Sequence, residues 1–209
     1  AAKRGKDTSM WLAIESVKKK ESDIVISAGN TGALLVIAKL NLKMIENIDK
    51  PALSALWPNK KGMSVVLDLG ANIECSSKNL LDFSIMGASL YKSLYPNEHP
   101  NVALLNIGSE ELKGNEIIKE TYLKMNEKKS NDFNFSGYIE GDKLMDGNVN
   151  VIVSDGFTGN VALKTAEGTA NFITSELKKA LGGNIVGKIS SLLNIVNLRK
   201  FKKRLDPRL

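Results

Sequence analysis

Short apolar runs alternate with segments of helical periodicity along most of the chain. Each run is about five or six residues long, ends in a loop containing glycine with asparagine or serine, and is followed by apolar residues at helical spacing. The runs predicted to be strands are Asp23–Ser27, Ser64–Leu69, Val102–Ile107 and Val149–Ser154. Apolar strands that alternate with helices are typical of parallel sheets buried on both faces. The sequence therefore predicts a layered α/β fold with a mostly parallel sheet and helices on both faces.

Weaker patterns predict the remaining elements of this fold. Asp7–Lys20 opens with residues that cap helices and continues with apolar residues at helical spacing, which predicts an amphipathic helix. Further helices are expected over Ala33–Asn41 and Asn115–Lys129. We expect additional strands over Phe135–Ile139 and over Pro51–Asn59, the second as an edge segment because of its prolines.

The C-terminal segment has a different character. Apolar residues at spacings of four, three and four are followed by a basic cluster around Phe201; they are Ile185, Ile189, Leu192 and Val196. An apolar stripe beside a basic cluster is typical of a helix or hairpin that lies on anionic lipid. We therefore divide the chain into an α/β domain, residues 1–183, and an amphipathic basic helical segment, residues 184–209. This segment is either part of the same domain or a protruding hairpin.

Composition narrows the class of protein. Six basic side chains between Arg199 and Arg208, against Asp206, account for nearly all of the +6 net charge, so a surface that coats nucleic acid is not expected. The single cysteine, Cys75, cannot form a disulfide within the chain, which favours a reducing, cytoplasmic compartment. No apolar stretch approaches the ~20 residues of a membrane-spanning helix. Neither end carries the features of a natural terminus, so we expect a chain cut at both ends.

The loops after the strands are the candidate site. In open α/β sheets, ligands bind beyond the carboxyl ends of the strands, where helix N-termini and glycine-rich backbone stabilise anions such as phosphate. Neither GxxxxGK[ST] nor GxGxxG is present, so the two common nucleotide sites are not expected. His99 is the only histidine and lies between two prolines, in a predicted surface turn. Ser–His or Cys–His nucleophilic catalysis therefore has no obvious base, a Cys/His zinc site is excluded, and Cys75 is interpreted as a small buried residue.

Four ordered motifs resemble one family. They are Ser27-Ala28-Gly29-Asn30-Thr31-Gly32-Ala33-Leu34, Asp68-Leu69-Gly70-Ala71-Asn72, Asn106-Ile107-Gly108-Ser109-Glu110-Glu111 with Lys113-Gly114-Asn115, and the run from Ser154 to Thr165, with Gly137-Tyr138-Ile139-Glu140-Gly141 between the last two. From about Lys3 to its end the chain resembles the bacterial phosphate acyltransferases, the PlsX family of fatty acid and phospholipid synthesis proteins. The family's N-terminal strand, its Asp-Ala-Met-Gly-Gly-Asp loop and its closing C-terminal segment are not found here.

The resemblance implies transfer of a fatty acyl group from acyl carrier protein to inorganic phosphate, by direct attack of bound phosphate on the thioester. The acyl-phosphate product would serve the first acylation of glycerol 3-phosphate by a membrane acyltransferase. The resemblance also implies a homodimer, contact with an anionic membrane surface, a fold like those of isopropylmalate dehydrogenases and phosphotransacetylases, and no metal or nucleotide cofactor.

Candidate residues follow from the loops and from the resemblance. Those predicted to be catalytic, by stabilising the oxyanion of the attacked thioester, are Asn72, Asn160 and Lys164. Those predicted to bind phosphate or substrate are Ser27, Gly29, Asn30, Thr31, Gly32, Asp68, Gly70, Asn72, Gly108, Asp155, Gly156, Thr158 and Gly159. Those predicted to contact the membrane are Leu192, Val196, Leu198, Phe201, Lys202 and Lys203.

Several alternatives remain open at this point. A phosphotransacetylase would share the chemistry but use acyl-coenzyme A, and a noncatalytic peripheral scaffold would recruit the membrane acyltransferase without turnover. A dehydrogenase is disfavoured, because Asp68 and Asp155 lie on different loops without the spacing of a divalent metal site. The basic segment could instead dock the acidic carrier protein or pack at a dimer interface, since charge alone attracts both lipid and carrier.

Overall fold

The computed structural model describes residues 5–127 and 130–205, apart from the side chains of Arg204 and Leu205. Its helices and strands, in chain order, are α1 (Ser9–Lys18), α2 (Thr31–Leu42), β1 (Ser54–Asn59), β2 (Gly62–Leu67), α3 (Ser77–Leu94), β3 (Asn101–Asn106), α4 (Glu116–Glu127), β4 (Asn134–Glu140), the 3-10 turn η2 (Gly141–Lys143), β5 (Val151–Val153), α5 (Gly156–Gly182), α6 (Ile185–Leu193) and α7 (Ile195–Leu205).

Five strands form one sheet in the order β1-β2-β5-β3-β4. β2, β5, β3 and β4 run parallel, whereas β1 pairs antiparallel with β2 as an edge strand. β5 is the last strand in the sequence, yet it lies between β2 and β3 at the centre of the sheet. The predicted α/β fold with a mostly parallel sheet is confirmed.

Alternate residues of each strand enter two separate hydrophobic cores. Val65 and Leu67 of β2 face the core beneath α3 and α4, whereas Val66 faces the opposite core, which α5 covers. In the same way, Val151 and Val153 of β5 face the core beneath α3 and α4, and Ile152 faces the core that α5 covers. This alternation is the two-residue period of a strand buried on both faces, and it explains why the strands are apolar throughout. α3 and α4 therefore cover one face of the sheet and α5 covers the other.

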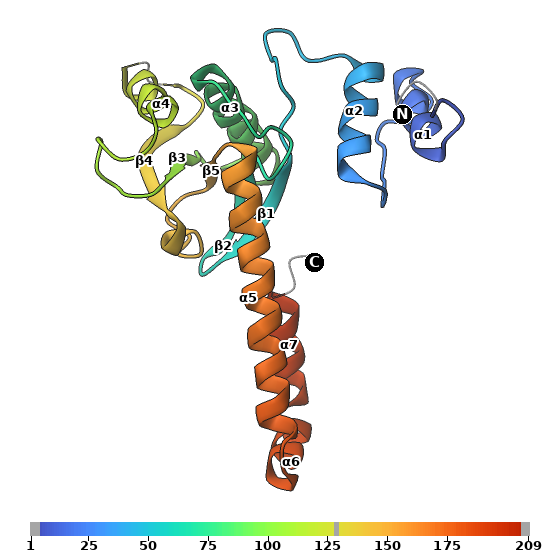
Figure 1. Ribbon diagram of the computed structural model, residues 1–209, viewed down its shortest axis with the longest axis vertical. Helices are drawn as coiled ribbons and strands as arrows, with labels where there is room; N and C mark the ends of the chain where they lie inside the picture. Colours follow the sequence, from blue (N-terminus) through green and yellow to red (C-terminus); the bar gives the residue numbers. More distant parts are fainter. Residues whose placement is uncertain (1–4, 128–129, 206–209) are drawn as a thin grey trace.

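The N-terminal helices form as predicted, but the strand predicted over Asp23–Ser27 does not. α1 is capped by Thr8, whose hydroxyl accepts from Trp11 N at 3.3 Å, and α2 by Asn30, whose Oδ1 accepts from Ala33 N at 3.0 Å. Between them, Asp23–Ser27 is irregular, and Ile24 and Ile26 are 74% and 89% exposed. The physical reason is that a strand needs a neighbour for its backbone N–H and C=O groups. Among the described residues, α1 and α2 pack on each other beside the sheet, and no strand adjoins this segment (Figure 1).

The C-terminal helices project from the sheet. α5 covers one face of the sheet with its first half and then extends beyond it, and α6 and α7 turn back alongside its far half (Figure 1). Asn184 begins this turn, since its Oδ1 accepts from Gly187 N at 2.7 Å as the cap of α6. The division of the chain at residue 184 stays a prediction. Within the described ranges, no helix is long and apolar enough to cross a membrane.

Candidate functional site

The loops that follow β2, β5 and β3 meet at one edge of the sheet. These strands are parallel neighbours, with Leu67 and Leu104 both in register with Val153. Their carboxyl ends therefore point to the same edge, where α5 and α3 also begin. The topology thus places together three of the four predicted loops, those that begin at Asp68, Ile107 and Ser154.

Asp68 organises the loop after β2. It is buried, and its Oδ1 accepts hydrogen bonds from the backbone N–H groups of Leu53, Gly70 and Ala71 at 2.9 to 3.1 Å. Its Oδ2 accepts from the backbone N–H and the side-chain Nδ2 of Asn72, at 2.8 and 2.7 Å. Five donors therefore surround one carboxylate. Asp68 therefore holds the loop in place. Both of its carboxylate oxygens already accept hydrogen bonds from the protein.

The start of α5 packs tightly on this same loop. Gly156 N donates to Asn72 O at 2.8 Å, and a Cβ at Gly156 would lie 2.6 Å from that oxygen. A Cβ at Gly159 would lie 1.9 Å from the backbone oxygen of Asp68, a distance that no side chain can occupy. These two glycines are therefore required for close approach of helix and loop, and they fix the position of the α5 N-terminus.

A cleft of about 930 Å³ opens at this edge. Three helix N-termini border it: α3 with its cap Ser76 and with Ser77, α4 with Asn115, and α5 with Asp155. Asn115 Oδ1 accepts from Ile118 N at 2.9 Å, and Asp155 Oδ1 accepts from Thr158 N at 2.8 Å. The first amides of a helix lack acceptors within it and carry the positive end of its dipole. Three such ends around one cleft make it a candidate anion site.

Two lysines add positive charge to the cleft. Lys50 Nζ donates to the backbone oxygen of Glu74 at 2.7 Å, and Lys124 Nζ donates to Ser77 Oγ at 2.8 Å and to Glu120 at 2.6 Å. The hydrogen bond from Lys124 is the main cause that lowers the pKa of Glu120. Lys50 has no carboxylate partner in these contacts, so its charge is available to an anion, whereas that of Lys124 is shared with Glu120.

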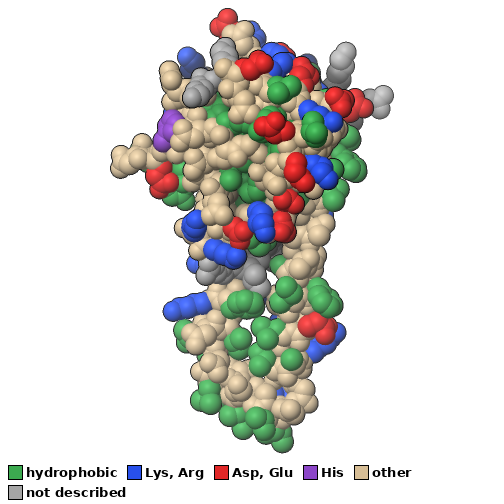
Figure 2. Space-filling view, turned by 90° about the vertical axis from the view of Figure 1, so that its left-hand side faces the viewer, with side chains coloured by type: hydrophobic (Ala, Val, Ile, Leu, Met, Phe, Trp, Pro, Cys, Tyr) green, Lys and Arg blue, Asp and Glu red, His purple; other side chains and the backbone are tan. Residues whose placement is uncertain are grey.

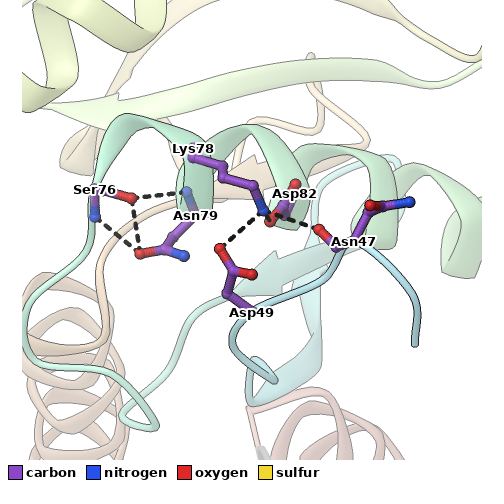
Figure 3. A network of polar contacts seen from close by, with 6 residues as sticks. All are labelled: Asn47, Asp49, Ser76, Lys78, Asn79 and Asp82. Atoms are coloured by element: carbon purple, nitrogen blue, oxygen red, sulfur yellow. Dashed lines mark hydrogen bonds and ion pairs between the residues drawn. The ribbon is translucent and has the colours of Figure 1, made fainter. Parts of the chain in front are cut away.

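Lys78 lines the same cleft, but its charge is already matched. Figure 3 shows its Nζ between Asp49 and Asp82, both at 2.9 Å, with the backbone oxygen of Asn47 also at 2.9 Å. The hydrogen bond to Asp82 is the main cause that raises the pKa of Lys78. This network ties residues 47–49 to the first turn of α3, next to the Ser76 cap. Lys78 therefore positions the cleft wall.

The predicted binding residues separate into three groups. Asp155 and Thr158 line the cleft. A second group lies behind it as structural support and consists of Asp68, Gly70, Asn72, Gly156 and Gly159. Gly108 is outside these groups; it lies in the loop after β3, and the last residue of that loop, Asn115, lines the cleft. The third group surrounds the start of α2, is largely exposed and does not line the cleft as described; it consists of Ser27, Gly29, Asn30, Thr31 and Gly32. Their binding role stays a prediction.

The three residues predicted to be catalytic differ in what their side chains can do. Both Nδ2 hydrogens of Asn72 have acceptors, Pro51 O and Asp68 Oδ2, each at 2.7 Å, so Asn72 is a positioning residue in this geometry. Asn160 is exposed on α5, within 3.6 Å of where a Gly70 Cβ would lie. The Lys164 side chain is 64% exposed, and its Nζ pairs with Glu167 at 2.8 Å.

Cys75 lines the cleft, whereas His99 lies away from it. Cys75 is buried, its Sγ contacts Asn72 O at 3.6 Å, and burial is the main cause that raises its pKa. His99 is exposed and precedes β3, at the edge of the sheet opposite the cleft. No three His, Cys, Asp or Glu side chains in the described ranges form a group that could hold a metal ion.

Most residues of the cleft were not predicted from the sequence, among them Lys50, Ser77, Asn115 and Lys124. Asn115 could have been predicted, because an Asn just before a helix is a capping signal and anions bind at capped helix N-termini. The lysines carried no comparable signal. Lys124 lies in the third turn of α4 and reaches the cleft because α4 packs beside α3. Lys50 lies before β1 and reaches it because this segment folds against the start of α3.

The fold and the cleft define the class: an α/β domain with a mostly parallel sheet and a candidate anion site at its carboxyl edge. Solved structures of the same fold include a phosphotransacetylase from Streptococcus pyogenes, with a TM-score of 0.58 at 16% identity over 75% of this chain and 54% of that one. EutD phosphotransacetylase from Staphylococcus aureus matches with a TM-score of 0.56, at 16% identity over 78% of this chain and 56% of that one. At such identity the likeness shows the fold alone.

Sequence comparison gives the family. The profile described as "Fatty acid synthesis protein" matches residues 1–209, and the chain belongs to that family. A relative from Pelagibacter ubique (strain HTCC1062) is 82% identical over the whole chain and 62% of its own length, and one from Maricaulis maris (strain MCS10) is 44% identical over the whole chain and 59% of its own. Both are named "Phosphate acyltransferase". The predicted resemblance is confirmed, and the chain spans about three fifths of the length of these relatives.

Proposed function

We propose that this chain forms the phosphate-binding part of an enzyme that transfers a fatty acyl group from acyl carrier protein to inorganic phosphate. The observation that carries the proposal is the cleft itself, where three helix N-termini and Lys50 surround a space large enough for an anion and a thioester. The name shared by the relatives supports acyl transfer to phosphate. The carrier-protein donor and the role in phospholipid synthesis are parts of this proposal that rest on the family resemblance.

The proposed chemistry is a direct displacement at the thioester carbonyl. A phosphate oxygen held by Lys50 and the helix amides attacks the carbonyl carbon, forming a C–O bond, and the C–S bond of the tetrahedral intermediate then breaks. The carrier thiolate leaves and takes up a proton, so acyl-phosphate and free carrier thiol are the products. Positioning and oxyanion stabilisation by N–H groups supply the rate enhancement without a covalent enzyme intermediate.

The hairpin formed by α6 and α7 is proposed to meet an anionic membrane surface. Figure 2 shows hydrophobic side chains gathered over the lower part of the molecule, where α5, α6 and α7 lie. Leu192 and Val196 are 71% and 61% exposed, Lys202 and Lys203 are exposed beyond them, and Leu198 is half-buried. Exposed apolar and basic side chains on one helical hairpin suit interfacial binding. We place the protein at the cytoplasmic membrane face as a homodimer that delivers acyl-phosphate to a membrane glycerol 3-phosphate acyltransferase.

The test of the reaction follows the release of carrier thiol. The protein is mixed with palmitoyl-acyl carrier protein, and free thiol is measured with and without phosphate. Phosphate-dependent release that yields acyl-phosphate supports the proposal. Equal release from palmitoyl-coenzyme A would favour a phosphotransacetylase instead, and liposome binding without release would favour a noncatalytic scaffold.

The role of Lys50 is tested by the same assay. Lys50→Met is expected to raise KM for phosphate about tenfold, the effect of losing one charge-assisted hydrogen bond of roughly 1.4 kcal/mol. The control is Lys92→Met, because Lys92 pairs with Asp132 on the surface of α3 and does not line the cleft. An unchanged KM in the Lys50 variant would remove this lysine from the phosphate site.

A further inference from the structure

One wall of the cleft carries an acidic side chain that is paired with a lysine of the same wall. Glu120 on α4 lines the cleft, and its Oε1 accepts a hydrogen bond from Lys124 Nζ at 2.6 Å. The same ammonium group donates to Ser77 Oγ at 2.8 Å. Ser77 is the first residue of α3 and is 4% exposed. Lys124 therefore joins a carboxylate of α4 to the buried N-terminus of α3.

The start of α3 is a place where an anion is stabilised. Ser76 and Asn79 cap the helix reciprocally, since Ser76 Oγ accepts from Asn79 N at 3.3 Å and Asn79 Oδ1 accepts from Ser76 N at 3.0 Å (Figure 3). This capping box leaves the backbone N–H groups of Ser77 and Lys78, which have no acceptor within the helix. A lysine ammonium group at this positive end of the helix dipole is unfavourable unless an anion accompanies it.

Glu120 supplies that anion. Its pKa is lowered, first by the hydrogen bond from Lys124 and second by the Ser77 hydroxyl, so its surroundings favour the charged carboxylate. The side chains of Glu120 and Lys124 are 56% and 46% exposed, and an ion pair exposed to this degree separates at little cost. A phosphate dianion carries more charge and more acceptor oxygens than a carboxylate, so it can replace Glu120 at the lysine.

We propose that Glu120 is an internal competitor of the anionic substrate, a carboxylate that pairs with Lys124 until phosphate displaces it. The identity of the anion rests on the proposed function, whereas the ion pair and the helix terminus do not. Lys124 and the Ser77 hydroxyl then bind phosphate together with Lys50. The negative charge of Glu120 stays close to the bound phosphate and weakens its binding, so this residue sets the affinity of the site. A moderate affinity also favours release of acyl-phosphate, whose phosphate group occupies the same position.

The experiment measures binding of inorganic phosphate by calorimetry at low ionic strength, which needs no acyl donor. Glu120→Gln keeps the shape of the side chain and removes its charge. Phosphate should bind to this variant about three- to fivefold more tightly, the upper range for one interaction between partly exposed charges. Lys124→Met removes the group for which the two anions compete, and it should weaken phosphate binding about fivefold.

Glu116→Gln is the matched control. Glu116 lies one turn before Glu120 on α4 and pairs with Lys119 at 3.1 Å, but its side chain is 92% exposed and does not line the cleft. Its replacement makes the same change of net charge on the same helix. Because solvent and salt screen an exposed charge, phosphate affinity should change by less than about twofold.

Several outcomes would overturn the proposal. These are no phosphate binding in any variant, unchanged binding in Glu120→Gln, or equal tightening in Glu116→Gln. Weaker binding in Glu120→Gln would also overturn it, because Glu120 would then hold Lys124 in place for the ligand.

The acyltransferase can fail separately. If the variants bind phosphate in the expected order but the protein releases no carrier thiol, the competition by Glu120 is upheld and the proposed reaction is refuted. If thiol release depends on phosphate but KM for phosphate is the same in Glu120→Gln as in the unchanged protein, the competition alone is refuted.

Discussion

Replacing Asp68 by asparagine should damage the loop that supports the cleft. The buried carboxylate accepts five hydrogen bonds, three at Oδ1 and two at Oδ2. Asparagine has nearly the same shape but only one acceptor oxygen. If that oxygen takes the Oδ1 position, the new NH₂ group faces the backbone N–H and the Nδ2 of Asn72, so donors oppose donors.

The size of the effect follows from the two lost bonds. Hydrogen bonds to a charged group contribute roughly 1.5 to 3 kcal/mol each, and part of the loss is offset because a buried charge is removed. We expect the free energy of unfolding to fall by about 3 kcal/mol. The α5 N-terminus should shift as well, because Gly156 donates to the backbone oxygen of Asn72 in this loop.

Urea unfolding followed by circular dichroism measures this loss. With a slope of about 2 kcal/mol per molar urea, the midpoint should fall by about 1.5 M. Asp132→Asn is the control, because Asp132 pairs with Lys92 on the surface with its side chain 67% exposed, and it should change stability by less than about 0.5 kcal/mol. A loss below about 1 kcal/mol for Asp68→Asn would refute the view that this carboxylate holds the loop.

Three further predictions address the same framework. Gly159→Ala should destabilise the fold by about 2 to 3 kcal/mol, because the added Cβ would meet the backbone oxygen of Asp68, whereas Gly168→Ala, in open space on the same helix, should stabilise it by about 0.5 to 1 kcal/mol. Thermal unfolding compares the two variants, and equal effects would contradict the close packing at Gly159. Cys75→Ala should keep phosphate-dependent release, and Cys75 should react slowly with iodoacetamide at neutral pH, because its raised pKa leaves little thiolate; loss of turnover would instead make it a nucleophile. Burial and, second, the hydrogen bond to Glu98 raise the pKa of Tyr91 to about 12, so the contribution of this group to stability is complete below about pH 10 and is lost as pH rises toward 12. A titration of tyrosinate absorbance should show one ionisation near the upper end of this range, and Tyr91→Phe should remove it.

The fold was predictable from the sequence because its strands are short, apolar and buried on both faces. The pattern Ser64–Leu69 followed by Gly70 predicts both β2 and the loop after it, and each later strand repeats that signal. Asp23–Ser27 carries the same signal and forms no strand. Its residues favour an extended backbone, but a strand also requires a partner, and no local pattern reports whether a partner lies alongside.

The candidate site was only partly predictable from the sequence. Its glycines belong to a recognisable motif, whereas its lysines belong to none. Gly156 and Gly159 are visible as a motif, yet the structure uses them to let α5 approach the loop closely. Lys50 leaves no local trace, since it reaches the cleft only when the segment before β1 folds against the start of α3. The sequence pattern therefore located the edge of the sheet where the site lies, and tertiary packing decided which side chains face into it.

One helix joins these observations. The N-terminus of α5 is fixed by two glycines against the Asp68 loop, its first half covers the sheet with Ala162, Leu163 and Ala166, and its far half carries the hairpin. Because one continuous helix spans these parts, a shift at Gly156 should also move the hairpin. The proposed phosphate site and the hairpin proposed to meet the membrane are thus joined by a single helix of 27 residues.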